Sequence, residues 1–82
     1  MQDKTPLNDK DQQHGQWERY HHNGNLWYKG EFINGVHNGP WVEYWENGNF
    51  YFKGSFINGN FCGLCLWYFK DLSIKESNFY AK

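Results

Sequence analysis

The sequence predicts an all-β protein, a single-layer antiparallel β-meander of about three hairpin repeats that is elongated and twisted. Three observations support this prediction: a repeat with a period of 24 residues, Asn-Gly pairs that divide each copy, and an unusual aromatic content. Eighteen of the 82 residues are Phe, Tyr or Trp, whereas Val, Ile and Leu together number 10. Such a composition suits short strands, tight turns and a core made of rings.

The repeat organises most of the chain. Residues 15–38 and 39–62 align without a gap and are identical at 12 of 24 positions. A third, degenerate copy spans 63–82 and matches the second copy only at Gly63 and Tyr68. A degraded last copy is what a repeat array needs at its end, where a cap replaces a further stacking surface. The structural repeat positions are Trp17, Gly30, Phe32, Gly35, Trp41, Gly54, Phe56 and Gly59.

Asn-Gly pairs predict where the strands turn. Asn23-Gly24 and Asn47-Gly48 each separate two aromatic runs, and Asn-Gly is the strongest short-range signal for a two-residue type I′ hairpin. Asn34-Gly35 and Asn58-Gly59 then supply the return turns between hairpins. The resulting strands are expected at about residues 16–22, 25–32, 40–46, 49–56, 64–70 and 73–80. Residues 1–14 are polar and lack aromatic side chains, so we expect a disordered leader.

Two-residue hairpin turns also predict the register. They place Trp17 opposite Gly30 and Trp41 opposite Gly54, so that each strand glycine leaves room for an indole ring. They also place His21 opposite Leu26 and Trp45 opposite Phe50. One face of the sheet is then expected to carry Trp17, Tyr28, Phe32, Trp41, Trp45, Phe50, Phe52 and Phe56. The other face is expected to carry Tyr20, Trp27, Tyr44 and Tyr51.

These residues resemble MORN repeats, in the bacterial variant of the YwqK-family antitoxin components. The pattern aromatic-x-Gly-x-Phe-x-x-Gly-x-x-x-Gly spans Tyr28–Gly39 and recurs over Phe52–Gly63. The typical motif continues with x-Gly, whereas this chain has Pro40-Trp41 and Leu64-Cys65. The resemblance covers roughly residues 15–69. It implies an elongated, twisted single-layer sheet with a scaffold or binding role, without implying a particular partner.

The cysteine and histidine residues are candidates for catalysis or metal binding. Cys62-Gly63-Leu64-Cys65 is a C-x-x-C, which is typical of a redox pair or of half a zinc site. No helix is predicted there to activate a thiol, and alignment shows Cys65 in the place of the repeat tryptophan. We therefore interpret Cys65 as structural. The histidines share no repeat position, and no catalytic arrangement is recognised, so we expect neither an enzyme nor a metal or cofactor site.

Charge and hydropathy narrow the class of partner. Eight Lys and Arg residues against nine Asp and Glu give a formal net charge of −1, which argues against nucleic acid held by phosphate contacts. The mean hydropathy is −0.95 and no apolar run approaches the roughly 20 residues of a membrane span. No signal peptide is recognised, so a cytoplasmic location is expected.

The exposed aromatic residues are the strongest functional lead, because a single-layer sheet has two open faces. We expect a non-catalytic protein-interaction module, a small inhibitor that is antitoxin-like or encoded by a phage or other mobile element, and a homodimer is a companion hypothesis. The alternative is a module that binds a small ligand, such as a nucleotide or sugar, or an acidic lipid. The predicted partner-binding residues are Tyr20, Trp27, Tyr44, Trp45, Tyr51, Trp67 and Tyr68.

Overall fold

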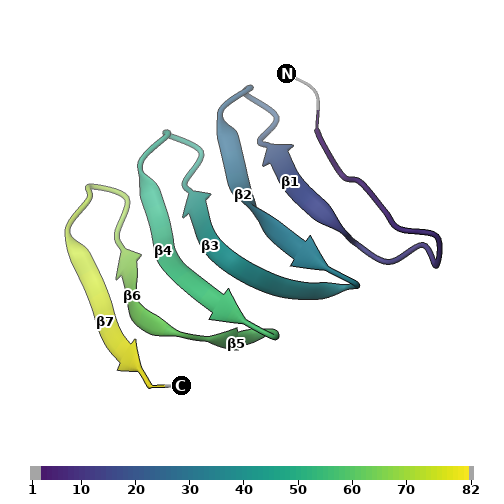
Figure 1. The fold of residues 1–82 in the computed structure, drawn as a ribbon. Helices are drawn as coiled ribbons and strands as arrows, with labels where there is room; N and C mark the ends of the chain where they lie inside the picture. The colour runs from purple at the N-terminus through teal and green to yellow at the C-terminus, as the bar shows by residue number, and fades with distance from the viewer. Residues whose placement is uncertain (1–2, 82) are drawn as a thin grey trace.

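The computed structural model describes residues 3–81 and confirms the predicted fold class: its strands form one antiparallel meander in a single open sheet. The strand order is β1-β2-β3-β4-β6-β7, with β5 paired only to β4, and the molecule measures 41 × 36 × 11 Å (Figure 1). No second layer covers either face over the described residues. The strands are β1 (Gly15–Tyr20), β2 (Leu26–Ile33), β3 (Val36–Tyr44), β4 (Phe50–Ile57), β5 (Asn60–Phe61), β6 (Gly63–Tyr68) and β7 (Ile74–Tyr80).

The hairpin turns differ from the two-residue turns that the sequence predicts. In the first, the Gly24 N–H donates to the His21 carbonyl and the His21 N–H donates to the Asn25 carbonyl. Only Gly24 has a positive φ, of 90°, whereas a type I′ turn requires two such residues. The turn therefore spans residues 21–25, and the same bonds recur at 45–49 and 69–73.

Type I′ geometry occurs at the return turns instead. Asn34 and Gly35 have φ values of 48° and 85°, and Ile33 pairs directly with Val36 across them. Asn58 and Gly59 repeat this arrangement with 50° and 83°. Because these turns hold only two residues, β3 begins at residue 36 rather than at the expected 40.

The predicted pairs of tryptophan and glycine are confirmed, since Trp17 lies opposite Gly30 and Trp41 lies opposite Gly54. Gly30 also pairs with Trp41 on its other side, and the ring that lies on Gly30 belongs to Trp41. A Cβ added at Gly30 would lie 1.9 Å from Cε3 of Trp41. Gly30 therefore accommodates the indole of the following repeat, whereas a Cβ at Gly54 would meet Phe52 and Cys65.

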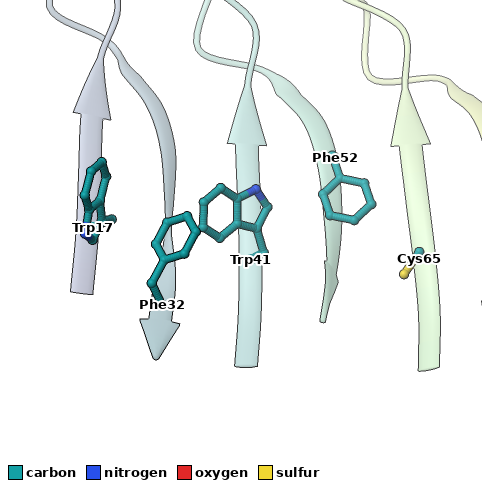
Figure 2. Close-up of a cluster of buried hydrophobic side chains, with 5 residues drawn as sticks. All are labelled: Trp17, Phe32, Trp41, Phe52 and Cys65. Atoms are coloured by element: carbon teal, nitrogen blue, oxygen red, sulfur yellow. The ribbon is translucent and has the colours of Figure 1, made fainter. Parts of the chain in front are cut away.

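One buried side chain from each of β1, β2, β3, β4 and β6 forms the core (Figure 2). These side chains are Trp17, Phe32, Trp41, Phe52 and Cys65, all less than 9% exposed. They pack edge to face or at an angle, as when the Trp41 ring lies 5.6 Å from that of Phe32. Cys65 is fully buried, and its Sγ would lie 2.8 Å from a Cβ on Gly54, in the space that the Trp41 ring occupies on Gly30.

The longer hairpin turns shift the register beside them. Tyr20 rather than His21 pairs with Leu26, and Tyr44 rather than Trp45 pairs with Phe50, because the pairing is irregular next to each turn. A slip of one residue moves a side chain to the opposite face. Phe50 therefore contacts Tyr44 and Tyr68 at 5.1 and 5.8 Å.

The shift corrects the predicted membership of the two faces. Trp27 lies 5.3 Å from the Tyr28 ring, and Tyr51 packs against the buried core, so both lie on the same face as Trp41. We call this the tryptophan face; it carries Trp17, Trp27, Tyr28, Phe32, His37, Trp41, Glu43, Tyr51, Phe52, Phe56 and Trp67. The opposite surface is the tyrosine face; it carries Glu18, Tyr20, Lys29, Val42, Tyr44, Phe50, Lys53, Leu66 and Tyr68.

The leader, expected from its composition to be disordered, lies along β1 over residues 3–14 (Figure 1). Lys4 and Glu18 exchange two backbone hydrogen bonds, and the Trp17 indole N–H donates to the Pro6 carbonyl at 2.9 Å. Asp3 accepts from the Tyr20 N–H and forms an ion pair with Arg19. Backbone and side-chain hydrogen bonds to a sheet edge thus order a segment that has little apolar surface to bury.

Asparagine side chains connect each hairpin turn to the next. Asn23 and Asn25 both donate from Nδ2 to the Glu46 carbonyl, at 2.7 and 2.8 Å. One repeat later, Asn47 and Asn49 donate in the same way to the Lys70 carbonyl. These hydrogen bonds connect the three hairpin turns along one edge of the sheet.

The third hairpin turn keeps this geometry with different residues. Asp71 and Ser73 replace the two asparagines, and the Asp71 carboxylate accepts from both the backbone N–H and the hydroxyl of Ser73. These hydrogen bonds lower the pKa of Asp71 below its ordinary value. Leu72 replaces the glycine and is held at a φ of 74°, a left-handed conformation that costs a non-glycine residue about 1 kcal/mol.

Candidate functional site

The candidate site is a shallow aromatic hollow on the tryptophan face. It consists of two adjoining depressions of about 200 and 130 Å³, which share Glu43 and Tyr51 in their linings. Trp27, Trp45, Phe61 and Trp67 line its two sides. We use the name aromatic hollow for these six residues together. Both depressions are smaller than the roughly 300–1,000 Å³ of typical small-molecule sites.

The irregular pairing beside the hairpin turns creates one side of the aromatic hollow. It brings Tyr51 to the tryptophan face, where its ring contacts the Trp45 ring at 4.8 Å. The Trp45 indole N–H donates to the Tyr68 carbonyl at 3.2 Å, which fixes the ring at the end of the sheet. Phe52 supplies the floor of the other side, 5.0 Å from Trp67 and 5.8 Å from Phe61.

Glu43 is the carboxylate between the two depressions. Its Oε1 accepts a hydrogen bond from the Trp41 indole N–H at 3.1 Å. Two cations of the chain already lie over rings of the hollow: Arg19 lies 5.3 Å from the Trp27 ring and Lys70 lies 5.3 Å from the Trp45 ring. An acidic side chain among electron-rich rings favours a positively charged group.

The structure divides the predicted partner-binding residues between the two faces. Trp27, Trp45, Tyr51 and Trp67 come together in the aromatic hollow. Tyr20, Tyr44 and Tyr68 lie on the tyrosine face, where Tyr44 stacks on Phe50. Burial raises the pKa of Tyr20, with the Glu18 carboxylate adding to the shift. The seven residues therefore do not form one contiguous surface.

Sequence reasoning missed Glu43, Phe61 and His37 as functional or structural positions. Glu43 occupies the repeat position of Arg19 and Trp67, so this position differs in all three copies, whereas the following residue is tyrosine in each. This variation does not single out Glu43, because the preceding position also differs in all three copies. His37 occupies the position of Phe61 and was interpreted only as an unshared histidine.

His37 is half-buried and packs against the aromatic core. Its ring lies 4.4 Å from Phe32, 4.6 Å from Phe56 and 4.6 Å from Trp41. Burial lowers the pKa of His37 below its ordinary value, and the Glu43 charge opposes the shift in part. The folded state therefore binds fewer protons than the unfolded state, so stability falls as the pH drops below about 6.5.

His37→Phe is expected to remove this contribution, because Phe61 shows that the repeat accepts a phenyl ring at this position. Urea denaturation of both proteins between pH 7.5 and 5 provides the measurement. The stability advantage of His37→Phe over the unmodified chain should grow as the pH falls. The control, His22→Ala in the exposed first hairpin turn, should leave the pH dependence unchanged. An advantage for His37→Phe that is constant with pH would contradict the interpretation.

The C-x-x-C residues take no part in the aromatic hollow. Cys62 is half-buried and Cys65 is fully buried, and both are free thiols. Cys65 packs where the repeat tryptophan would lie, in agreement with its interpretation as structural. Within residues 3–81, no group of three or more His, Cys, Asp or Glu side chains could hold a metal ion.

Three further depressions are more polar or lie elsewhere. One of about 630 Å³ is an open space against the leader, where Asn8 donates to Gln12 and Asn34. Another of about 310 Å³ lies on the tyrosine face beside Lys29 and Tyr44. A third of about 380 Å³ lies beside Ile57, Phe61 and Cys62. None of the three brings together a set of residues with an evident chemical role.

Comparison with known proteins identifies the family. The model of the MORN repeat variant matches residues 13–34 and 38–58, which is more than half of the chain. The chain therefore belongs to the family of MORN repeat variants, whose repeats are generally non-enzymatic modules for interaction with proteins or lipids. No curated protein and no solved structure gives a significant match. Between residues 3 and 81, no helix has the length and apolar character to cross a membrane.

Proposed function

We propose that this chain is a non-catalytic protein-interaction module that acts as a small, antitoxin-like inhibitor by covering a surface of a partner protein. The observation that carries the proposal is the aromatic hollow: a shallow, ring-lined surface with Glu43 between its two depressions. Trp and Tyr are the commonest energetic anchors of protein interfaces. The inhibitory role itself is the expectation from the resemblance to antitoxin components, and the hollow supplies a surface for it.

The dimensions of the hollow favour a protein over a small molecule. Its depressions are too small to enclose most of a nucleotide or sugar, but they suit single side chains that project from a partner. An arginine or lysine of the partner could pair with Glu43 and lie against the neighbouring rings. We therefore expect a partner surface that presents a basic side chain.

The test is co-purification of a tagged chain from its native host, with two matched double variants. Trp27→Ala plus Tyr51→Ala removes two rings of the aromatic hollow, whereas Tyr20→Ala plus Tyr68→Ala removes two rings of the tyrosine face. A stoichiometric protein partner should be lost with the first pair and kept with the second. The isolated partner should then lose activity when the unmodified chain is added back.

Other outcomes would overturn the proposal. Loss of the partner only with the tyrosine-face pair would place the contact on the other face. A small molecule released on denaturation, in the absence of a protein partner, would favour a ligand-binding module. Co-sedimentation with phosphoinositide vesicles would favour a lipid-binding module. Glu43→Gln separates the charge contribution, because it should weaken partner binding most at low salt.

A further inference from the structure

The tyrosine face becomes progressively less charged from the first repeat to the third. The first repeat carries Glu18, Lys29 and Glu31 there. The equivalent positions of the second repeat are Val42, Lys53 and Ser55, and those of the third repeat are Leu66, Ser77 and Phe79. A solvent-exposed cap requires a polar outer surface, so this trend is the reverse of what a terminal repeat needs.

The third repeat, in which this face is least charged, exposes large apolar side chains. Phe79 is 76% exposed, Leu64 57% and Ile74 58%, and Leu64 pairs directly with Phe79 across β6 and β7. Leu66 and Tyr68 continue the same surface. We call these five residues the C-terminal patch. They contain no charged side chain, although their equivalents in the first repeat include Glu18 and Glu31.

On the tryptophan face, in contrast, β7 presents polar side chains. Glu76 and Asn78 stand at the positions of Phe52 and Gly54, and Asn78 donates from Nδ2 to Glu76 at 2.6 Å. Asn78 stands at the repeat position of Gly30, where the glycine leaves room for the Trp41 ring. The large apolar side chains that β7 exposes, Ile74 and Phe79, therefore lie on the tyrosine face.

We propose that the C-terminal patch is a self-association surface, on which a second copy of this chain packs face to face. Two sheets pack with their faces about 10 Å apart, which brings the patches of two copies into direct contact. Residues 63–81 contain two lysines, one aspartate and one glutamate, so two copies meet without a net charge repulsion. The charged residues of the first repeat stay outside the contact, which accounts for the decrease in charge from the first repeat to the third.

The available area supports a weak but specific dimer. At roughly 150–200 Å² for a fully exposed large side chain, Phe79, Leu64 and Ile74 alone offer on the order of 300–400 Å² per copy. With Leu66, Tyr68 and the surrounding atoms, a symmetric contact approaches about 1,000 Å² in total, the lower limit for a specific interface. We therefore expect a dissociation constant in the range of about 1–100 μM. The aromatic hollow lies on the other face and remains accessible.

Sedimentation equilibrium of the purified full chain from 1 to 500 μM tests the proposal without any partner. The mass should rise from that of the 9.9 kDa chain to twice that value across this range. Phe79→Ser and Leu64→Ser should each raise the dissociation constant at least tenfold. Both side chains are exposed, so circular dichroism should show an intact fold. The matched control, Ile57→Ser, removes an apolar side chain that is 42% exposed outside the patch and should leave the dimer unchanged.

Two results would overturn the proposal. A chain that stays monomeric at 500 μM would show that a second copy does not cover the patch. A dimer that survives both serine substitutions would be held by another surface, such as backbone pairing along the free edge of β7. Because no partner protein enters this experiment, its outcome is independent of the test of the aromatic hollow.

Discussion

Gly30→Ala is expected to lower the free energy of unfolding by about 3 kcal/mol or more. The new methyl group would lie 1.9 Å from Cε3 of Trp41 and 2.6 Å from Cζ3, far inside van der Waals contact. The indole cannot move freely, because Tyr28 stacks on it at 5.0 Å and its N–H donates to Glu43. A domain of this size has a total stability of only about 4–12 kcal/mol, so the loss should be evident in urea denaturation.

Two comparisons separate this clash from a general effect of alanine. Lys29→Ala changes the preceding, exposed strand position and should alter stability by less than about 0.5 kcal/mol. Gly54→Ala should be intermediate, at about 1–2 kcal/mol, because its methyl group would meet the Phe52 ring edge at 2.6 Å and the Cys65 thiol at 2.8 Å. Equal effects of the two glycine substitutions would contradict the role assigned to the Trp41 ring.

Trp41→Ala is expected to cost about 4 kcal/mol and to leave the chain largely unfolded at 37 °C. Trp41 is 5% exposed and contacts Tyr28, Phe32, His37 and Phe56. No second layer exists over the described residues to close the space that its loss would leave. Thermal denaturation followed by circular dichroism measures the effect.

Trp45→Ala is the matched control for Trp41→Ala, because it removes the same side chain from a half-buried position at the end of the sheet. We expect a cost of about 1–2 kcal/mol, from its contact with Tyr51 and its hydrogen bond to Tyr68. A cost for Trp45→Ala as large as that for Trp41→Ala would show that the core is not centred on the buried row of Figure 2.

The fold could be predicted because two kinds of information agreed. The period of 24 residues defined the repeat, and strand alternation fixed the pairs of Trp17 with Gly30 and Trp41 with Gly54. The hairpin turns could not be predicted from the Asn-Gly pairs alone. Asn23-Gly24 and Asn34-Gly35 have the same sequence, yet only the second forms a type I′ turn. The difference depends on neighbouring hydrogen bonds, such as those from Asn23 and Asn25 to Glu46.

The candidate site was harder to predict than the fold. Of the seven aromatic residues predicted to bind a partner, only Trp27 is exposed and the others are half-buried. The one-residue shift beside each hairpin turn also moved Trp27 and Tyr51 to the other face. The order of the leader could not be predicted from its composition. The composition shows only that the leader has little apolar surface to bury. It does not show that the backbone of Lys4 and the carbonyl of Pro6 form hydrogen bonds with residues of β1.

The asparagines that connect successive hairpin turns also give this edge of the sheet a direction. The first and second turns each donate two side-chain hydrogen bonds to the turn that follows. At the third turn the Asp71 carboxylate cannot donate, and the Ser73 hydroxyl is already used within the turn. The third turn therefore accepts such hydrogen bonds without offering an equivalent pair of donors, so the two ends of this row of turns differ chemically.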